Sequence, residues 1–326
     1  MSFNREYLIS SIFRLSSENE FNDLALKLFH YQYLNNPVYH KFVDIFKIKT
    51  NNIVHFSDIP FLPVELFKSH RIISGKNDYE RIFMSSGTTS GNRSTLYVKD
   101  TGLYEKSFVS TFQFFFGNPS DYHILALLPG YHEESSLIYM VRNLIQQSNS
   151  DLSGFYIGKD EELAGILQKT KGRKIILFGV TYALLEFAKK FLLNLPGLII
   201  LETGGMKGKN KEMIREEVHS IIRQSIGVPA VYSEYGMTEL FSQAYSQSHG
   251  LFKSPPWMRI LARDINDPLT LVQPGRTGGI NIIDLANIDS CSFIATADLG
   301  KVNKDGSFEI TGRYDNSDLR GCNLML

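Results

Sequence analysis

A loop of seven small residues has the composition of an anion-binding site. Ser85-Ser86-Gly87-Thr88-Thr89-Ser90-Gly91 consists only of serine, glycine and threonine, and it follows the apolar segment Ile82-Phe83-Met84. Glycines let several backbone N–H groups point at one anion, and hydroxyl groups add donors without bulk. The loop has no G-x-x-x-x-G-K-[ST] pattern, so it is not a P-loop. By itself it predicts either a phosphate cradle or a plain surface loop.

Four later segments carry glycines, carboxylates and an arginine in a definite order. They are Glu202-Thr203-Gly204-Gly205, Tyr235-Gly236-Met237-Thr238-Glu239, Ala297-Asp298-Leu299-Gly300 and Thr311-Gly312-Arg313-Tyr314-Asp315. A carboxylate suits Mg²⁺, a hard cation that bridges it to phosphate oxygens, and it suits the two hydroxyls of a ribose. Together with the loop, these segments resemble the adenylate-forming superfamily of acyl-CoA ligases, luciferases and adenylation domains. The resemblance runs from about residue 58 to the C-terminus.

Within that superfamily, the chain is most similar to the LuxE-type acyl-protein synthetases. The similar segments are Leu62-Pro63-Val64-Glu65-Leu66-Phe67-Lys68, Glu202-Thr203-Gly204-Gly205-Met206-Lys207-Gly208 and Arg320-Gly321-Cys322-Asn323-Leu324. The resemblance implies an ATP-dependent ligase that activates a fatty acid as its acyl-adenylate. It further implies that the acyl group moves to a cysteine of the enzyme near the C-terminus, and that a partner reductase then takes it on to the aldehyde.

The resemblance also assigns roles around the phosphates of ATP. Residues Ser85 to Ser90 would wrap the phosphates, and Arg93 would stand in for the lysine of the family pattern. Thr238 would hold the α-phosphate, and Glu239 would bind Mg²⁺. The alternative for Glu239 is a glutamate at a strand end that faces solvent.

The remaining matched residues would bind the nucleoside. They are Gly204, Gly205, Tyr235, Gly236, Asp298 and Arg313. The paired glycines would let the backbone approach the adenine, and the tyrosine could stack on it. The aspartate would accept from the ribose hydroxyls, and the arginine would meet ribose or phosphate. The alternatives are an ordinary strand-to-loop turn, a core tyrosine, a turn-forming aspartate and a surface arginine.

Two cysteines differ in the roles that the sequence predicts for them. Cys322 is the predicted acyl acceptor, because Arg320 would favour its thiolate and Gly321 would let the thiol swing toward an adenylate. Its alternative is an inert cysteine at a frayed chain end. Cys291 has no such neighbours, and we expect it to be structural.

Two further features bear on the acyl group. His132 follows Leu128-Pro129-Gly130-Tyr131, where the family resemblance places a residue near the activated carboxylate. A histidine without a function is the alternative. The aromatic run at residues 112–116 could line an acyl pocket, although such a run more often belongs to the core.

Composition limits the class of protein. The chain has 326 residues, and 34 Lys and Arg balance 34 Asp and Glu, so no basic footprint for nucleic acid is present. Two cysteines cannot form a disulfide framework, which fits a reducing cytoplasm. The N-terminal residues lack the pattern of a signal peptide, and no apolar run reaches the roughly 20 residues that span a bilayer. We expect a soluble cytoplasmic protein.

Hydrophobic periodicity predicts an α/β fold. Residues 1–48 show helical spacing, and continuous apolar strands near 123–128, 174–178, 198–201 and 231–235 alternate with helices, which predicts parallel strands covered on both faces. Short alternating segments after residue 250 predict a small antiparallel sheet. One of them is Phe293-Ile294-Ala295-Thr296, so Asp298 is expected just after a strand. We expect one adenylate-forming domain over 1–326, with a helical part at 1–57, an α/β core at 58–250 and a β-rich part at 251–326. Since the sequence ends soon after Arg313, we expect the C-terminal cap domain of the superfamily to be absent or supplied by a partner.

Three hypotheses remain open at this point. The first is an acyl-protein synthetase that acylates Cys322. The second is an adenylate-forming ligase that passes its acyl group to CoA or a carrier protein, in which Cys322 is dispensable. The third is a nucleotide-binding subunit without turnover that serves a partner enzyme.

Overall fold

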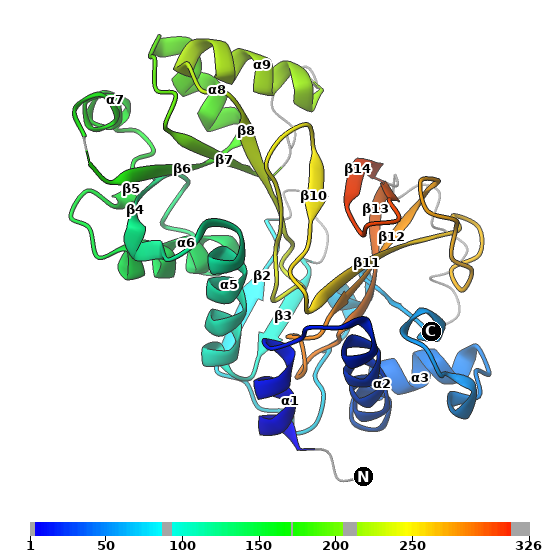
Figure 1. Ribbon diagram of the computed structural model, residues 1–326. Coiled ribbons are helices and arrows are strands. Elements are labelled where there is room, and N and C mark those ends of the chain that lie inside the picture. The colour runs from blue at the N-terminus through cyan, green and yellow to red at the C-terminus, as the bar shows by residue number, and fades with distance from the viewer. Residues whose placement is uncertain (1–3, 87–92, 171, 205–213, 314–326) are drawn as a thin grey trace. The chain divides into compact units, whose positions relative to one another are not determined.

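The computed structural model describes residues 4–86, 93–170, 172–204 and 214–313 (Figure 1). The chain divides into two compact units. The first unit comprises residues 1–107, 237–242 and 253–326, and the second comprises residues 108–236 and 243–252. The boundaries that the sequence predicts inside a single domain stay a prediction.

The second unit is built around a parallel sheet. Its hydrogen-bonded strand order is β9-β8-β7-β6-β4-β5, in which only β9 runs antiparallel to its neighbour. Figure 1 shows α8 and α9 on one side of this sheet and α6 on the other. The elements are η3 Pro119–Asp121, β4 Tyr122–Leu127, α6 Ser136–Ser148, β5 Gly154–Phe155, α7 Asp160–Lys169, β6 Lys174–Val180, α8 Thr181–Lys190, β7 Ile199–Thr203, α9 Arg215–Ile226, β8 Val231–Tyr235, β9 Ala244–Ser246 and β10 Leu251–Lys253. The predicted parallel α/β arrangement is therefore confirmed.

Both faces of this sheet are apolar, because successive side chains along each strand point to opposite faces and both faces are covered. Leu177, Ile200 and Val231 belong to the buried cluster formed with α7, α8 and α9. Their neighbours in the chain, such as Phe178 and Leu201, are equally buried and point to the opposite face. On the side of the sheet that faces α9, the side chains therefore come from even-numbered residues in β7 and from odd-numbered residues in β8.

Helices α6 and α9 of the second unit have residues at their ends that favour the start or the end of a helix. The Ser135 side chain accepts a hydrogen bond from the Ile138 N–H and caps α6. Asn149 ends α6 in the left-handed conformation, and Gly227 ends α9 in the same way at φ 72°.

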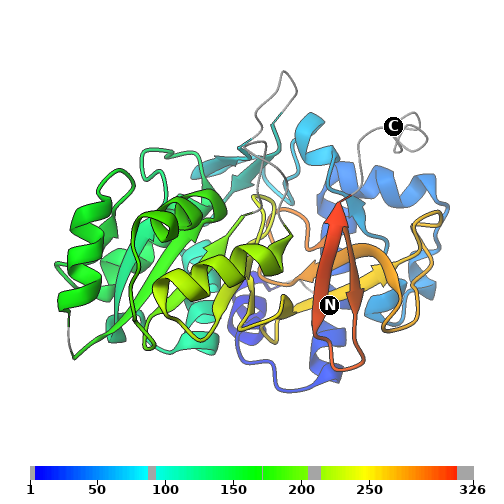
Figure 2. The same ribbon diagram turned by 90° about the horizontal axis from the view of Figure 1, so that it is seen from above.

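The first unit combines N-terminal helices with an antiparallel sheet. The order of its main strands is β11-β12-β13-β14, and β1 pairs in parallel with the first part of β13. Figure 2 shows β13 and β14 side by side. The elements are α1 Arg5–Ile12, α2 Glu18–Asn35, α3 Pro37–Ile45, η1 Thr50–Asn52, η2 Phe56–Asp58, β1 Leu62–Pro63, α4 Leu66–Ser69, β2 Arg81–Met84, β3 Thr95–Val98, α5 Thr101–Phe116 (which continues into the second unit), β11 Met258–Arg263, β12 Thr277–Asp284, β13 Phe293–Val302 and β14 Phe308–Arg313.

The helical start and the antiparallel sheet agree with the sequence prediction, with one correction. The sequence places Asp298 just after a strand, whereas β13 continues through Asp298 to Val302. The reason is the pairing of β13 with β14, which keeps residues 298–302 extended beyond the apolar segment. No helix among the described residues is both long enough and apolar enough to cross a membrane.

A buried amide ties the helices of the first unit to its sheet. Gln32 of α2 is fully buried, and its side-chain nitrogen donates to the carbonyl oxygens of Asn287 and Ile288 at 3.0 and 2.9 Å. Its oxygen accepts from the Ser292 N–H at 2.9 Å. Because every polar atom of the amide has a partner, α2 is held in one register against the β12–β13 connection.

Gly300 lies at a bulge between β13 and β14, where the backbones come too close for a side chain. A Cβ atom at this position would stand 2.2 Å from the Glu309 carbonyl oxygen. The register of the two strands also shifts between Leu299 and Gly300. Glycine is therefore required beside Asp298 by the close approach of two backbones.

We predict that Gly300→Ala lowers the free energy of unfolding by about 1–3 kcal/mol, because the added methyl group forces the hairpin apart. Urea unfolding followed by circular dichroism measures the change. Gly312→Ala is the matched control on the same hairpin, since a Cβ there meets nothing within 4 Å. Equal stability of the two variants would contradict the close approach at residue 300.

Candidate functional site

A buried carboxylate fixes the segment that carries Thr238 and Glu239. Asp284, at the end of β12, accepts hydrogen bonds from the backbone N–H groups of Phe241 and Ser242, both at 2.8 Å. It also accepts from the Ser242 hydroxyl at 2.7 Å and from the Ala286 N–H at 3.2 Å. Four donors thus converge on one carboxylate, which holds residues 237–242 against the antiparallel sheet of the first unit.

Glu239 is buried within the first unit, with only 4% of its surface exposed. Its carbonyl oxygen accepts from the Asn287 side chain at 2.8 Å, and its carboxylate accepts from Ser94. Burial raises the pKa of Glu239, while Ser94 and the positive charges of Arg313 and Lys68 act in the opposite direction. The alternative of a solvent-facing strand-end glutamate is therefore wrong.

The described ends of the Ser/Gly/Thr loop meet at the base of the β2–β3 hairpin. The Ser85 N–H donates to the Ser94 carbonyl at 2.9 Å, and the Ser94 N–H donates to the Ser85 hydroxyl at 3.0 Å. Arg93 is exposed, and its Nε donates to the Ser85 carbonyl oxygen at 2.6 Å. Ser86 is exposed next to this base. The predicted residues Gly87, Thr88, Thr89 and Ser90 lie outside the described residues.

Asp298 and Arg313 stand directly opposite each other on β13 and β14. Arg313 Nε lies 3.6 Å from Asp298 Oδ1, and the two side chains are 57% and 16% exposed. Because Arg313 also acts on Glu239, the first unit brings together the carboxylate predicted for Mg²⁺, Ser94 at the hairpin base and the pair predicted for ribose. Arg313 is the last residue of β14 rather than part of a turn, but its side chain is exposed, as the alternative of a surface arginine predicts.

In the second unit, a buried polar network supports the turn at Gly204. The Thr181 hydroxyl lies 2.9 Å from the Gly204 carbonyl oxygen and also contacts the Glu202 carboxylate. The other oxygen of Glu202 lies 3.0 Å from His219 Nε2 and 3.2 Å from the Ser233 hydroxyl. Burial would raise the pKa of Glu202, but hydrogen bonds from His219 and Thr181 outweigh it and lower the pKa. Gly204 has a φ of +76°, which favours glycine. Gly205 lies outside the described residues.

Tyr235 and Gly236 follow a second glutamate at the end of β8. The Tyr235 ring lies 5.9 Å from the Phe252 ring, and Gly236 is exposed. Glu234 accepts a hydrogen bond from the Thr203 hydroxyl. Burial raises the pKa of Glu234 to about 7, against the lowering effect of that hydrogen bond. Among the described residues, no cation forms an ion pair with this carboxylate.

The residues predicted for the acyl group have mixed outcomes. His132 is exposed in the turn after β4, where its N–H donates to the Pro129 carbonyl at 3.2 Å. Phe112 is fully buried, and Phe116 packs on Tyr245 at 5.1 Å, which fits the core alternative for the aromatic run. Cys291 is fully buried, and burial raises its pKa to about 12, as expected of a structural thiol. Cys322 lies outside the described residues.

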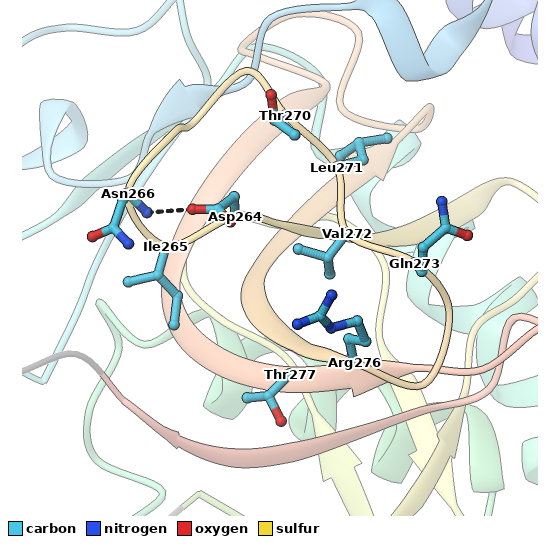
Figure 3. Close-up of a pocket in the computed structure, with 9 residues that line it drawn as sticks. All are labelled: Asp264, Ile265, Asn266, Thr270, Leu271, Val272, Gln273, Arg276 and Thr277. Atoms are coloured by element: carbon cyan, nitrogen blue, oxygen red, sulfur yellow. Dashed lines mark hydrogen bonds between the residues drawn. The ribbon is translucent and has the colours of Figure 1, made fainter.

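A hollow of about 340 Å³ in the first unit lies apart from all of these residues (Figure 3). The loop between β11 and β12 forms it, with Asp264, Thr270 and Arg276 on its wall. The Asn266 N–H donates to Asp264 at 2.7 Å and stabilises this loop. Within the described part of the chain, no three His, Cys, Asp or Glu side chains are grouped as a metal site.

Several residues that shape these sites carry no motif signal. The chain separation between bonded groups is 42 residues for Asp284 and Ser242, 48 for Asn287 and Glu239, and 17 for His219 and Glu202. Only the apolar segments around Asp284 and Asn287 hint that these polar side chains are buried. Glu234 stands next to a predicted motif, but its environment depends on Thr203 of another strand.

The fold is that of the adenylate-forming enzymes. MatB from Rhodopseudomonas palustris with bound ATP has a TM-score of 0.56 at 18% identity, over 73% of this chain and 49% of that chain. A 2-hydroxyisobutyryl-CoA ligase in complex with 2-HIB-AMP and CoA has a TM-score of 0.69 at 12% identity, over 92% of this chain and 70% of that chain. O-succinylbenzoate coenzyme A synthetase (MenE) from Bacillus subtilis, with ATP and magnesium, has a TM-score of 0.53 at 15% identity, over 74% of this chain and 53% of that chain.

Sequence comparison narrows this class. Residues 7–107, which include the segment Leu62–Lys68, match the family described as acyl-protein synthetase, LuxE, which confirms the LuxE-type resemblance. The chain is also 25% identical over 261 residues to YdaB of Bacillus subtilis (strain 168), which carries the name of an acyl-CoA ligase. That match covers 73% of this chain and 48% of YdaB, so the chain spans about half the length of this relative.

We predict that Asp284→Asn lowers the free energy of unfolding by about 2–4 kcal/mol, because one acceptor oxygen becomes an NH₂ group that faces N–H donors. Ser242→Ala removes one of the four hydrogen bonds and should cost only about 1 kcal/mol. Urea unfolding of both variants and the wild type gives the comparison. If Asp284→Asn lowers the free energy of unfolding less than Ser242→Ala does, the carboxylate does not hold this segment.

The raised pKa of Glu234 predicts a pH-dependent cost. The folded-state pKa of about 7 lies above the ordinary 4.5, so stability falls as pH rises from about 4.5 to 7. Glu234→Gln keeps an acceptor for Thr203 and removes the charge. We expect it to raise the free energy of unfolding by about 1–2 kcal/mol at pH 8, with no difference at pH 4.

Urea unfolding at both pH values tests this prediction. The exposed Glu161→Gln of α7 is the control, and it should leave the wild-type pH dependence in place. If Glu234→Gln behaves like this control, the carboxyl of Glu234 is not destabilising in the folded chain.

Proposed function

We propose that this protein activates a carboxylic acid with ATP as an acyl-adenylate and then transfers the acyl group to a thiol. The observation that carries the proposal is the convergence of Glu239, Ser94 and the Asp298–Arg313 pair in the first unit. A buried carboxylate beside hydroxyl donors and an arginine suits a magnesium nucleotide, because it requires a counter-charge and offers oxygen to a hard cation. The adenylate-forming fold and the LuxE match support the same activity.

In this proposal the residues of the chain position and neutralise the reacting groups. Glu239 would hold Mg²⁺, and Thr238, Arg93 and the loop from Ser85 to Ser90 would bind phosphate oxygens. Bound Mg²⁺ would supply charge neutralisation of the phosphates. Asp298 and Arg313 would bind the ribose, and Gly204, Gly205, Tyr235 and Gly236 the adenine. The assignment of these residues to the nucleoside is supported by the Asp298–Arg313 pair across β13 and β14 and by the positive φ of Gly204.

The proposed reaction has two steps, and each step forms one bond and breaks another. A carboxylate oxygen of the substrate attacks the α-phosphorus of ATP, and the bond to the leaving pyrophosphate breaks. A thiolate then attacks the acyl carbon of the mixed anhydride, and AMP leaves with the bonding electron pair. We propose Cys322 as this thiol, a fatty acid as the substrate, His132 near its carboxylate, and an acyl reductase in the cytoplasm as the next partner. The similarity of residues 7–107 to the LuxE family supports this version.

A second candidate is transfer to CoA or to a carrier protein. The named relative YdaB and the CoA complex of 2-hydroxyisobutyryl-CoA ligase favour it. The two candidates share the adenylation step and differ only in the acceptor thiol. They are therefore separated by whether the protein itself becomes acylated.

We predict that incubation with ATP, Mg²⁺ and the correct carboxylic acid adds one acyl group to the protein. Intact-protein mass spectrometry measures the gain, and hydroxylamine should remove it because the link is a thioester. Cys322→Ser should abolish the gain. Cys291→Ala is the matched control and should leave it unchanged, since burial raises the pKa of that thiol to about 12.

Two other outcomes would redirect the proposal. Pyrophosphate release that depends on the acid, without a mass gain, would assign the acyl group to CoA or a carrier protein. ATP binding without pyrophosphate release for any acid would sink the proposed activity and favour a nucleotide-binding subunit.

A further inference from the structure

Buried polar side chains meet at the carboxyl end of the parallel sheet, next to the Gly204 turn. They are Thr181 of α8, Glu202 of β7, His219 of α9 and Ser233 of β8. Glu202 lies at the centre, since its Oε1 contacts the Thr181 hydroxyl and its Oε2 lies 3.0 Å from His219 Nε2. The Ser233 hydroxyl donates to the same Oε2 at 3.2 Å. One carboxylate therefore joins α8 and α9 to the ends of β7 and β8.

This network fixes the two strand ends that lead into the residues proposed for the adenine. Glu202 and Ser233 are direct neighbours in the register of β7 and β8. Gly204 stands two residues beyond Glu202, and Tyr235 stands two residues beyond Ser233. In an open α/β sheet, ligands bind outside the carboxyl ends of the parallel strands. A shift of either strand end would therefore move Gly204 and Tyr235 relative to each other.

Thr181 carries the contact from the carboxylate to the backbone of the turn. Its hydroxyl oxygen lies 2.9 Å from the Gly204 carbonyl oxygen. Because a hydroxyl has one proton, its place between Glu202 and Gly204 couples these two acceptors. Glycine has more backbone freedom than any other residue, so a contact from outside the turn is needed to hold the Gly204 carbonyl in one direction.

Stability alone gives little reason for His219. The other buried residues of α9 are Val218, Ile222 and Ile226, so an apolar side chain would fit the buried side of this helix. Replacement of a buried polar pair by well-packed apolar residues is often neutral or stabilising. A hydrogen-bonded network adds direction instead, because it holds each partner in one orientation.

On the basis of the proposed function, we propose that His219 is a positioning residue of the nucleotide site, which acts through Glu202 and Thr181 on the Gly204 carbonyl. A partner on Oε2 weakens the competition of the Glu202 carboxylate for the Thr181 proton, so this proton stays available to Gly204. The turn then keeps the direction in which its backbone would meet the adenine. The residues proposed for the phosphates belong to the first unit, so phosphate binding should not depend on His219.

The test measures binding of ATP with Mg²⁺ by titration calorimetry, which requires neither a carboxylic acid nor an acceptor thiol. Inorganic triphosphate, titrated as a competitor, measures phosphate binding alone. We expect Thr181→Val and His219→Leu each to weaken ATP binding about three- to tenfold, because each removes one hydrogen bond of the network. Both variants should leave the dissociation constant of inorganic triphosphate unchanged. The double variant should bind ATP no more weakly than the weaker single variant, since both residues act on the same carbonyl.

Conservative variants and a matched control separate positioning from stability. Thr181→Ser and His219→Gln keep a hydrogen-bond donor and should bind ATP within about twofold of the wild type. Ser148→Ala is the control, because its buried hydroxyl bonds Ser153 at 2.7 Å, and Ser153 bonds the Ile124 N–H near the start of β4, at the opposite end of the sheet. It should lower stability in urea unfolding without a change in ATP binding.

Each remaining outcome has a definite meaning. Thr181→Val and His219→Leu that lose stability but bind ATP as the wild type does would overturn the positioning role and leave the proposed function standing. Equal weakening for ATP and inorganic triphosphate would overturn it too, since the effect would then not concern the base. His219→Asn, whose shorter side chain does not reach Glu202, replaces His219→Leu if that variant does not fold. A wild type that binds no ATP would overturn the proposed function itself, and the role of His219 would fall with it.

Discussion

The Asp284 carboxylate is the constraint on which the first unit depends. It lies at the end of β12, and two backbone N–H groups, a hydroxyl and a further N–H from the β12–β13 connection all donate to it. A buried charge of this kind is tolerated because four donors are aimed at it. The segment with Thr238 and Glu239 is therefore positioned by the antiparallel sheet, although it follows directly on a strand of the parallel sheet in the chain.

Around that anchor, the first unit assembles charges that repel or attract one another at short range. The Asn287 side chain holds the backbone carbonyl of Glu239, so the carboxylate of Glu239 cannot turn away into solvent. Arg313 pairs with Asp298 across the strands and also acts on Glu239, which joins the two predicted functions through one cation. The hairpin of β2 and β3 adds Ser94 to the same group. Such an arrangement gains most from a ligand that carries both anionic oxygens and a divalent cation.

The sequence predicts the sheets and the motif positions well because both depend on local patterns. Continuous apolar strands identify β4, β6, β7 and β8, and glycine-rich turns identify where they end. Asp298 is the instructive error: its strand is longer than its apolar segment, since pairing with β14 extends it. Local patterns cannot predict the anchoring role of Asp284, because its partners Phe241 and Ser242 lie more than 40 residues away in the chain. Arg93 likewise could be predicted as a phosphate ligand but not as a donor to the Ser85 carbonyl oxygen.

Glu234 and Glu202 show why electrostatic compensation has to be examined residue by residue. Both lie at the carboxyl end of the parallel sheet, and of the two only Glu202 has a histidine partner. A glutamine at position 234 would keep the hydrogen bond from Thr203 and avoid the cost of a partly buried charge. Stability alone therefore does not account for a glutamate at position 234. The same reasoning does not extend to Glu202, whose hydrogen bonds already explain its place beneath the Gly204 turn.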